Sequence, residues 1–399
     1  MSNTPVTTAV SASSPGADLA DLKRKSVRGG LATLLGQGIS TGVQLVSTVV
    51  LARLLSPEDF GVTSMVGAVT AFAGLFRDLG LSSAAIQKRD LSRALQSNLF
   101  WINVTMGAVL TGLLAAASPL VARFYARPEL TMVTVALSFN FLISSFGTQH
   151  GVLLTRRMEF GRKALAEIGG AILGLTVSIG LALRGYRYWA LVWGGLSGSA
   201  ASVLLLFAVS PFRPSLPRRD TGLMALLGFG ANVTAFDIVN YFHRNLDRLL
   251  IGRVWGAEAV GLYSRAYALL MFPIQAIRNP LNAVAFPAMS KLQHQPVAFR
   301  MYYRRLCFLV AFLSMPLSAF LLVLSRPVIH LVLGSHWDGA VPVFSSLAFV
   351  AFVQPAITLW GIVSLSSGMS RRYLTLGVLN TAFSVSGMAL GLPWGAVGV

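Results

Sequence analysis

The feature that most constrains the fold is a series of apolar runs, each about 20 residues long, that recurs from end to end of the sequence. A helix of that length crosses the ~30 Å hydrocarbon core of a bilayer. The runs are continuous and do not alternate between apolar and polar residues, which argues against membrane-spanning strands. Only 12% of the residues are charged, about half the share in a soluble domain. The sequence therefore predicts an all-α polytopic membrane protein.

The basic residues alternate regularly with the apolar runs. The net charge is +18, and 21 of the 32 Lys and Arg residues lie before the first run or in every second loop, against seven in the other loops. Cytoplasmic loops carry such an excess, so we expect a cytoplasmic N-terminus and need no nucleic-acid partner to explain the charge. Residues 1–25 begin with a stretch rich in Ser, Thr, Ala and Pro, without the features of a signal peptide. We expect them to be a disordered cytoplasmic segment.

Residues that usually hold metals or cofactors are few and scattered. Cys307 is the single cysteine, which excludes an internal disulfide and a cysteine-based metal cluster. His330 and His336 share a predicted loop, but their spacing matches no common metal motif. The sequence contains no Walker A motif. We therefore expect no metal, no cofactor and no P-loop ATP site.

The apolar runs form two sets, separated by the segment SPFRPSLPRRDT. We expect an N-terminal lobe over 26–209 with about six helices, a cytoplasmic linker over 210–222, and a C-terminal lobe over 223–399 with about five. The predicted spans are 30–54, 59–79, 95–118, 130–154, 164–184, 188–209, 223–252, 257–289, 303–325, 340–367 and 372–392. Glycines four residues apart favour close helix packing, and they occur as Gly38/Gly42, Gly170/Gly174 and Gly194/Gly198.

The two sets of spans resemble each other in sequence. Residues 51–66 read LARLLSPEDFGVTSMV, and residues 251–266 read IGRVWGAEAVGLYSRA. Identical residues at an offset of 200 are Arg53/Arg253, Glu58/Glu258, Gly61/Gly261 and Ser64/Ser264. Both halves begin on the same side of the membrane, so an internal duplication would be parallel, with its axis along the membrane normal.

The repeat also predicts how the second lobe ends. The last six residues, WGAVGV from Trp394, align with WALVWG from Trp189, which opens the sixth span. Residues 394–399 are therefore expected to begin a twelfth span. On this interpretation the C-terminal lobe is incomplete in this chain, and the intact protein is longer.

One predicted span carries an unusual set of charges. Residues 232–254 read NVTAFDIVNYFHRNLDRLLIGRV, inside the run that begins near Leu223. Six polar residues are spaced by three, one, three, three and one, which places them on one stripe of a helix: Asp237, Asn240, Tyr241, Arg244, Asp247 and Arg248. A charge facing lipid costs at least ~2.5 kcal/mol near the bilayer centre, so we expect the stripe to face protein or a wet cavity.

Two interpretations of this stripe stay open. It could be a structural ion-pair network, with Arg244 paired to Asp247. Alternatively, it could form the cationic wall of a water-filled cavity, joined by Arg265 and Arg278 from the next helix. Guanidinium groups bind phosphate or pyrophosphate through two parallel hydrogen bonds, and an acidic sugar would also fit. Asp237 or Asp247 would then be candidates for binding a proton or a sodium ion that drives transport.

The first half offers weaker candidates for contacts with a ligand. Asn140 and Gln149 are polar residues inside the fourth predicted span, with Gln44 and Asn103 as weaker candidates in other spans. Single amides in spans more often hydrogen-bond to neighbouring helices than to ligands. The predicted cavity is therefore asymmetric, with most of its charge in the C-terminal lobe.

Three prolines recur every seven residues in the eighth predicted span. They are Pro273, Pro280 and Pro287. Each removes a backbone hydrogen bond and can kink a helix. They would either fix a permanent curve or act as hinges during alternating access.

Three segments resemble those of a known transporter family. They are SVRGGLATLLGQGISTGVQLVSTVVLARLLSPEDFGVTSMV in the first two spans, LLTRRMEFGRKALAEI over 153–168, and RNPLNAVAFPAMSKLQ over 278–293. From about Ser26 to its last residue, the chain resembles Wzx-type flippases of lipid-linked oligosaccharides. These belong to the multidrug/oligosaccharidyl-lipid/polysaccharide exporter superfamily, and the colanic-acid-exporter branch is the most similar.

This resemblance implies two six-helix lobes around a central cleft that opens alternately to either side of the bacterial inner membrane. It implies a flippase, without enzymatic activity, that moves an undecaprenyl-pyrophosphate-linked glycan from the cytoplasmic to the periplasmic leaflet. A polysaccharide polymerase and a chain-length regulator would be further partners. By location, the cationic cleft of the family would correspond to Arg244, Arg248 and Arg265.

Three other functions are possible for such a chain. A drug or small-cation exporter of the same fold would favour acidic residues in its cavity, whereas arginines outnumber aspartates here. An accessory scaffold of a polysaccharide assembly complex would not need charges at mid-membrane. A membrane glycosyltransferase would need a large extramembrane loop or acidic catalytic residues, and the short loop 325–340 is the one candidate.

Overall fold

The computed structural model describes the chain outside residues 1–14, 78–81, 83–91, 218–223, 358 and 367–368. Side chains that lie outside the description include those of 15–34, 224–240 and 242–244. The described residues form helices and connecting loops. The N-terminal lobe contains α1 (Pro15–Leu54), α2 (Pro57–Gly74), α4 (Arg93–Tyr125), α5 (Leu130–Arg156), α6 (Phe160–Leu183) and α7 (Tyr188–Val209). The C-terminal lobe contains α8 (Met224–Leu292), α9 (Pro296–Val323), α10 (Ser325–Val332), η1 (Ser335–Trp337), α11 (Ala340–Ile357), α12 (Leu359–Ser366), α13 (Ser370–Gly391) and η2 (Leu392–Val397).

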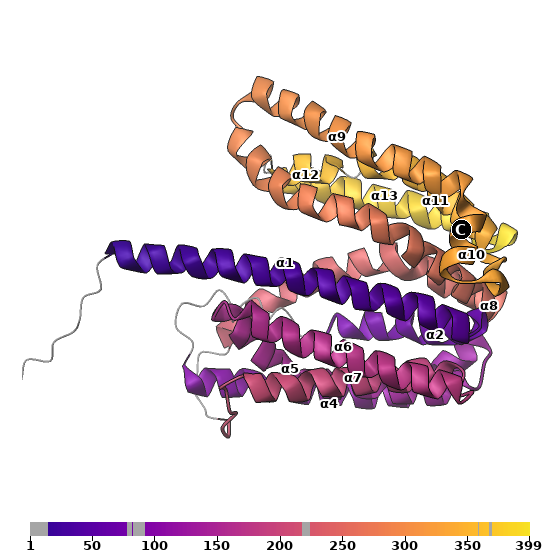
Figure 1. Ribbon diagram of the computed structural model, residues 1–399, viewed down its shortest axis with the longest axis horizontal. Coiled ribbons are helices and arrows are strands. Elements are labelled where there is room, and N and C mark those ends of the chain that lie inside the picture. Colours follow the sequence, from indigo (N-terminus) through magenta and orange to yellow (C-terminus); the bar gives the residue numbers. More distant parts are fainter. Residues whose placement is uncertain (1–14, 78–81, 83–91, 218–223, 358, 367–368) are drawn as a thin grey trace, which may run out of the picture.

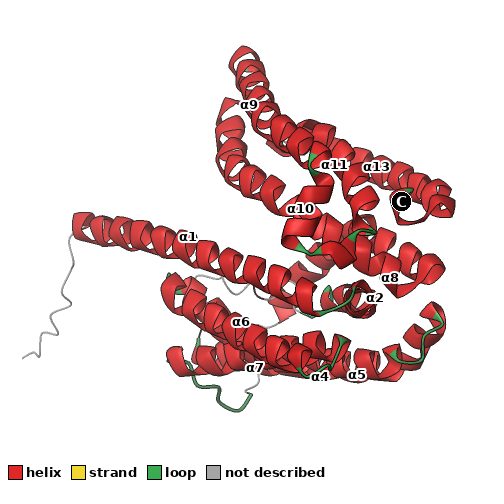
Figure 2. Ribbon diagram, turned by 45° about the vertical axis from the view of Figure 1, so that its right-hand side comes forward, coloured by secondary structure: helices red, strands yellow, loops and turns green. Residues whose placement is uncertain are grey.

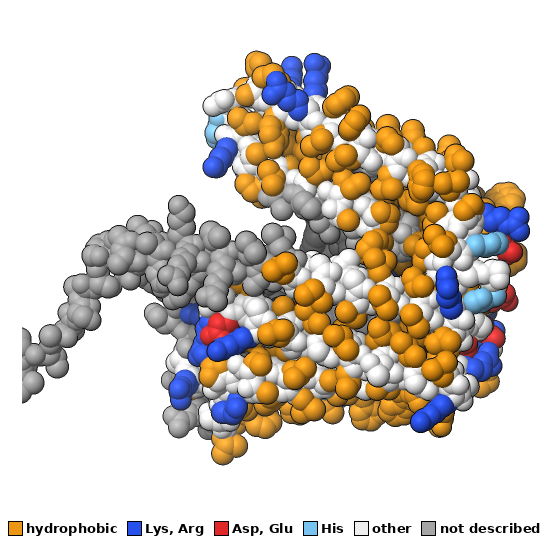
Figure 3. All heavy atoms as spheres, in the orientation of Figure 1, with side chains coloured by type: hydrophobic (Ala, Val, Ile, Leu, Met, Phe, Trp, Pro, Cys, Tyr) orange, Lys and Arg blue, Asp and Glu red, His pale blue; other side chains and the backbone are white. Residues whose placement is uncertain are grey.

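The predicted all-α membrane fold is confirmed. Seven helical segments in the described part of the chain are long and apolar enough to cross a membrane. They belong to α1, α4, α5, α6, α7, α9 and the stretch Thr375–Val397. Large apolar side chains such as Leu204, Phe308 and Phe383 point outward, as expected for a surface solvated by lipid tails. Figure 3 shows apolar side chains spread over both lobes, with Lys and Arg gathered toward the ends of the helices.

The two lobes meet at one end of the molecule and diverge toward the other (Figures 1 and 2). At the diverging end lie the start of α4, the end of α5, the start of α6 and the start of α9, which carry the basic clusters of the sequence. We call this the basic end and the opposite one the closed end. Figure 3 shows the surface hollowed between the lobes on the side of the basic end.

Counterparts of the sequence repeat face each other at the closed end. A Cβ atom added to Gly61 would lie 1.7 Å from the carbonyl oxygen of Ala257, and one added to Gly261 would lie 1.8 Å from that of Pro57. Since Pro57 and Ala257 are also 200 residues apart, the contact is reciprocal. The hydroxyl oxygens of Ser64 and Ser264 lie 3.1 Å apart. A pseudo-two-fold axis through this contact relates α2 to the second part of α8, which supports the predicted duplication.

Further interlobe contacts lie at the closed end. The carbonyl oxygen of Ala52, near the end of α1, accepts a hydrogen bond from Trp337 Nε1 (2.9 Å) and lies 2.8 Å from His336 Nε2. Arg53 donates a 2.7 Å hydrogen bond to the carbonyl oxygen of Leu331. Trp337 is fully buried against the ring of Phe60. The loop after α10 is thereby fastened to the end of α1.

The helix α8 contains both of the spans predicted for 223–252 and 257–289. Gly256, with φ 82° and ψ −175°, interrupts it at the boundary that the sequence predicts. This left-handed backbone is readily adopted by glycine. Pro273, Pro280 and Pro287 lie within the second part of α8, and among the described residues of this helix only Gly256 has non-helical backbone angles. The sharp turn of α8 thus comes from a glycine, and a hinge at the prolines stays a prediction.

The N-terminal segment differs from the sequence-based expectation, and the last residues lie where a twelfth span was expected to begin. α1 begins at Pro15, inside the segment 1–25 that was expected to be disordered. Proline at the first helical position, early acidic residues and Ala, Leu and Lys favour this earlier start. Residues 1–14 lie outside the described part of the chain. The expected twelfth span is represented by the short 3₁₀ helix η2, whose Leu392 carbonyl accepts a 2.8 Å hydrogen bond from Trp255 Nε1.

Candidate functional site

The charged stripe of the sequence lies on the first part of α8, which runs between the lobes (Figure 1). The side chains of Asp237, Asn240 and Arg244 are outside the described residues, so their roles as ion-coupling and substrate-binding candidates stay predictions. The structure does place Tyr241, Asp247 and Arg248, as well as Arg265 and Arg278 further along α8.

Tyr241 and Asp247 make contacts that hold helices together. The hydroxyl of Tyr241 donates a 2.5 Å hydrogen bond to the carbonyl oxygen of Ala68 on α2, and its ring packs on Phe72. The buried carboxylate of Asp247 accepts a 2.7 Å hydrogen bond from the hydroxyl of Tyr263. Tyr241 therefore binds the opposite lobe, whereas it was predicted to contact substrate. The carboxylate of Asp247 contacts Tyr263, and the pairing with Arg244 stays a prediction because the side chain of Arg244 is outside the described residues.

Arg265 lines a cavity of about 650 Å³ between the lobes. The other lining residues come from α1, α6 and α7. The guanidinium carbon of Arg265 lies 4.5 Å from the centre of the Phe60 ring, a cation–π distance that fixes the side chain at the cavity. Because Ser264 contacts Ser64, Arg265 belongs to the part of the cavity nearest the closed end.

Arg248 lines a second cavity of about 250 Å³, together with residues of α1 and the second part of α8. Gln44 and Thr48 line both cavities, so the two spaces adjoin along the same face of α1. The guanidinium carbon of Arg248 lies 5.9 Å from the centre of the Tyr267 ring. Gln44, Arg248 and Arg265, three of the candidates named from the sequence, thus line adjoining cavities.

Neither arginine at these cavities is neutralised among the described residues. Arg248 and Arg265 form no ion pair there, and the Nε atom of each is buried without a hydrogen-bond partner. Two uncompensated cations inside a membrane protein are costly, and their mutual repulsion adds to the cost. An anion between the lobes would remove both penalties. The geometry therefore suits a ligand with a phosphate or pyrophosphate group.

The wall of the larger cavity opposite Arg265 is built from small residues on α6 and α7. A Cβ atom on Gly170 would lie 2.6 Å from the Gly198 carbonyl oxygen, and one on Gly174 would lie 2.7 Å from that of Gly194. The packing role predicted for Gly170/Gly174 and Gly194/Gly198 is confirmed, whereas nothing lies within 4 Å of a Cβ placed on Gly38 or Gly42, so that pair makes no such close contact. The close approach leaves a flat surface of hydroxyls and backbone, which the sequence analysis did not identify as part of a site. The spacing of Gly and Ser by three and four along both helices was the available signal.

The remaining candidates lie away from these two cavities. Arg278 has a buried Nε atom without a hydrogen-bond partner but lines neither cavity. Asn140 Oδ1 and Gln149 Nε2, both on α5, are also buried without partners, and neither residue lines either cavity. The cavity wall in the N-terminal lobe comes from α1, α6 and α7.

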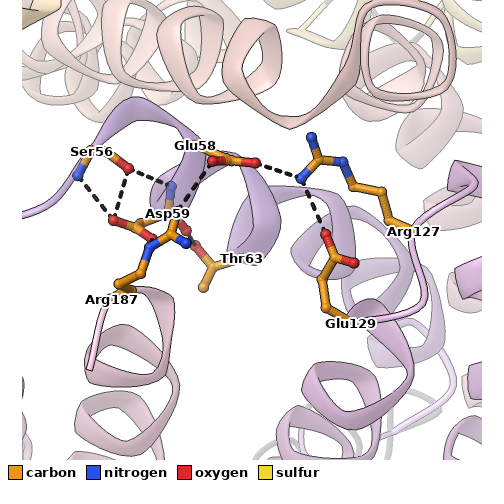
Figure 4. A network of polar contacts seen from close by, with 7 residues as sticks. All are labelled: Ser56, Glu58, Asp59, Thr63, Arg127, Glu129 and Arg187. Atoms are coloured by element: carbon orange, nitrogen blue, oxygen red, sulfur yellow. Dashed lines mark hydrogen bonds and ion pairs between the residues drawn. The ribbon is translucent and has the colours of Figure 1, made fainter. Parts of the chain in front are cut away.

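An ion-pair network at the closed end was missed by the sequence analysis (Figure 4). The carboxylate of Glu58 accepts hydrogen bonds from Arg127 Nη1 at 2.7 Å and from Arg187 Nη2 at 3.2 Å. Arg127 also contacts Glu129 at 3.2 Å, and Arg187 Nε lies 3.3 Å from the buried Asp59. The hydrogen bond to Glu58 raises the pKa of Arg127. The network ties two loops to the start of α2, where Ser56 and Asp59 form a capping box.

Comparison with known proteins agrees with this architecture. The model of a family described as "Polysaccharide biosynthesis protein" matches residues 50–342. The lipopolysaccharide biosynthesis protein WzxC of Escherichia coli K12 is 27% identical over 385 residues, covering 95% of this chain and 77% of its own length. The teichuronic acid biosynthesis protein TuaB of Bacillus subtilis 168 is 29% identical over 333 residues, covering 82% of this chain and 68% of its own length.

A solved structure shares the fold. The lipid II flippase MurJ, in an inward closed conformation, has a TM-score of 0.73 at 13% identity and covers 93% of this chain and 83% of its own chain. The likeness shows that the two lobes are arranged as in this class of membrane transporter. Because the family model spans well over half of the chain, the protein belongs to the family described as "Polysaccharide biosynthesis protein".

Proposed function

We propose that this protein is a flippase that moves an undecaprenyl-pyrophosphate-linked oligosaccharide from the cytoplasmic to the periplasmic leaflet of a bacterial inner membrane. The observation that carries the proposal is the pair of arginines, Arg248 and Arg265, that lie beside cavities between the lobes and form no ion pair with any described residue. A pyrophosphate presents several oxygens to two guanidinium forks and supplies the missing negative charge.

The arrangement of the lobes fits transport by alternating access. The lobes are fastened at the closed end through Gly61, Gly261, Ala52 and Trp337, whereas the basic end is open. Under the positive-inside rule, the basic end faces the cytoplasm, and so does the N-terminus. The structure then corresponds to a state that receives substrate from the cytoplasmic leaflet.

Coupling and partners complete the proposal. Asp237 or Asp247 would bind a proton or sodium ion; of the two, Asp247 is buried and accepts a hydrogen bond from Tyr263. The protein would act as a transporter, leaving polymerisation to a separate enzyme with its chain-length regulator. The relatives named for lipopolysaccharide and teichuronic acid biosynthesis support a glycan as cargo.

A drug or cation exporter is the chief rival, and the site argues against it. A cationic drug would meet the positive charges of Arg248 and Arg265. Of the residues that line the two cavities, Glu167 is the one acidic residue. Its carboxylate lies 3.8 Å from Lys163 and is therefore partly neutralised.

The test is flipping of a fluorescent lipid-linked oligosaccharide in proteoliposomes, compared between wild type, Arg265→Ala and Arg265→Lys. Loss of a charge-assisted hydrogen bond of about 1.5–3 kcal/mol predicts a roughly 10- to 100-fold slower rate for Arg265→Ala. Arg265→Lys keeps the positive charge but loses the two parallel hydrogen bonds of the guanidinium group, so its rate should lie between those of the wild type and Arg265→Ala. Arg253→Ala, at the exposed counterpart of Arg53, serves as the control. A wild-type protein that flips no such lipid, with or without an ion gradient, would contradict the proposal.

A further inference from the structure

The larger cavity has a chemistry of its own, distinct from that of the arginines. Its lining follows three stripes, 40–51 on α1, 167–178 on α6 and 191–202 on α7. Each stripe covers eleven residue steps, about 16 Å of helix. The cavity is therefore elongated along the helices, with Glu167 toward the basic end and Arg265 toward the closed end.

The wall between these two charges is neutral and presents both polar and apolar groups. Most of its residues are small, its larger apolar side chains are Val43, Leu51, Leu175 and Leu191, and it has no aromatic ring. Five serines and one glutamine on it make no side-chain hydrogen bond to any described residue: Ser40, Ser47, Ser178, Ser199, Ser202 and Gln44. Each serine hydroxyl can donate one hydrogen bond and accept two, and the amide can do both.

The glycines of this wall add backbone to the polar surface. Gly194, Gly195 and Gly198 line the cavity on α7, and nothing lies within 4 Å of a Cβ placed on Gly195. Without side chains, helix carbonyl oxygens are open to a second hydrogen bond from a ligand. The space at Gly195 belongs to the cavity.

Together with Arg265, whose buried Nε atom lacks a partner, this wall forms a composite site. We infer that the wall of α1, α6 and α7 binds the sugar residues of the cargo, while Arg265 binds the phosphate to which they are attached. A polyol needs many neutral donors and acceptors, a lipid tail needs apolar side chains, and a cationic drug needs acids or aromatic rings. The wall offers the first of these sets. This inference rests on the proposed function, because it divides one substrate between two lobes.

If the wall binds the sugars and Arg265 binds the phosphate, a mutation of the wall should slow the flipping of long glycans more than that of short ones. A mutation of Arg265 should slow both. Gly195→Leu adds a bulky side chain at the cavity wall, from a Cβ position that has nothing within 4 Å. Gly180→Leu is its matched control, since Gly180 is an exposed glycine on α6 with free space around its Cβ position and does not line the cavity.

The first test measures flipping with two probes in proteoliposomes. One is the lipid-linked oligosaccharide pool extracted from the native host, and the other is the same lipid trimmed to its first sugar, both fluorescently tagged. Gly195→Leu should slow the oligosaccharide at least tenfold and the single-sugar lipid less than threefold, whereas Arg265→Ala slows both. Equal slowing of the two probes by Gly195→Leu, or none, would overturn the inference.

A second test detects binding without transport. With Cys307 replaced by serine, Ser199→Cys should react with a membrane-impermeant maleimide, and the free oligosaccharide, released from its lipid by mild acid, should protect it at least threefold. His294→Cys, in the exposed α8–α9 loop, should react without protection. A Ser199→Cys protein that is unreactive or unprotected would refute the glycan wall. Protection in a protein that flips nothing would uphold the wall and refute the proposed function.

Discussion

The two copies of the repeated segment, 51–66 and 251–266, have the same scaffolding role but different chemistry. Each presents a glycine to the backbone of the other, and each contributes one serine to the contact at the pseudo-two-fold axis. The first copy carries Glu58 and Asp59, which bind Arg127 and Arg187. In the second copy, Glu258 is exposed, and the helix is broken at Gly256.

The repeat also shows where the function resides. At the offset of 200, the counterpart of Arg265 is Met65, which is fully buried in the core. The counterpart of Arg248 is Thr48, and both line the smaller cavity. The two copies thus share a symmetric frame, but at these two pairs of equivalent positions the cations stand on one lobe and neutral residues on the other.

The largest expected effect comes from breaking the symmetric contact with Gly61→Ala. The added Cβ would overlap the backbone of Ala257, which cannot rotate away, so we expect a loss of about 1–3 kcal/mol and a lower midpoint of thermal unfolding in detergent. Gly67→Ala on the same helix is the control, because nothing lies within 4 Å of its added Cβ. Equal midpoints for the two variants would show that the glycine contact does not hold the lobes.

Replacing Arg248 by threonine, the residue at the equivalent position 48, tests whether flipping needs the cation that only the C-terminal copy carries at this position. Arg248→Thr should slow flipping about tenfold, which corresponds to ~1.4 kcal/mol of lost interaction with the anion. The rate is measured in proteoliposomes at low and high salt. Arg253→Thr, at an exposed position of α8, should keep the wild-type rate. A normal rate in Arg248→Thr would leave Arg265 as the sole cation that acts on the cargo.

Glu58 and Glu258 occupy equivalent positions in the two repeat copies, but removing their charges should change the free energy of unfolding by different amounts. Glu58→Gln removes two ion pairs that are partly open to solvent, so we expect a loss of about 1 kcal/mol or less in the free energy of unfolding. Glu258→Gln should change nothing, since it forms no ion pair among the described residues. Denaturation curves of the two variants at low ionic strength make the comparison, and equal losses would contradict the role assigned to the network.

The smallest effect is expected at Asp338, in the loop before α11. The hydrogen bond from His330, with help from Arg326, lowers the pKa of Asp338. A carboxyl group whose pKa is lower in the folded state stabilises that state at pH values above its pKa in the unfolded chain. The stabilisation is lost as the pH falls to the pKa of the folded state. Because the group is exposed, Asp338→Asn should leave the unfolding midpoint unchanged at pH 7. A clear drop at pH 7 would mean that this loop stabilises the closed end more than its exposure indicates.

The sequence predicted those features that depend on local pattern. Apolar runs locate α5 to α7 to within four residues, whereas α4 ends seven residues beyond its predicted span. The offset of 200 predicted a duplication, and the equivalent glycines Gly61 and Gly261 lie where the two copies meet. Arg248, Arg265 and Gln44 were selected because charges and amides in spans need a polar surrounding.

The rest depends on contacts between distant segments. Arg127 and Arg187 looked like loop charges, and their partner Glu58 lies 69 and 129 residues away. Tyr241 was assigned to the substrate because it lies on the charged stripe, yet its hydroxyl binds Ala68, 173 residues away. The neutral wall arises only when α6 and α7 pack at their glycines, which a single helix does not reveal.

The central claim is that Arg248 and Arg265 bind the pyrophosphate of the cargo. The most direct measurement is the affinity of purified protein in nanodiscs for undecaprenyl pyrophosphate without sugar. It compares the wild type with the double variant Arg248→Thr/Arg265→Met, which carries the residues found at the equivalent positions of the N-terminal half. We predict saturable binding by the wild type, weakened at least tenfold in a double variant that stays folded. Equal affinities would contradict the claim and assign the two arginines a purely structural role.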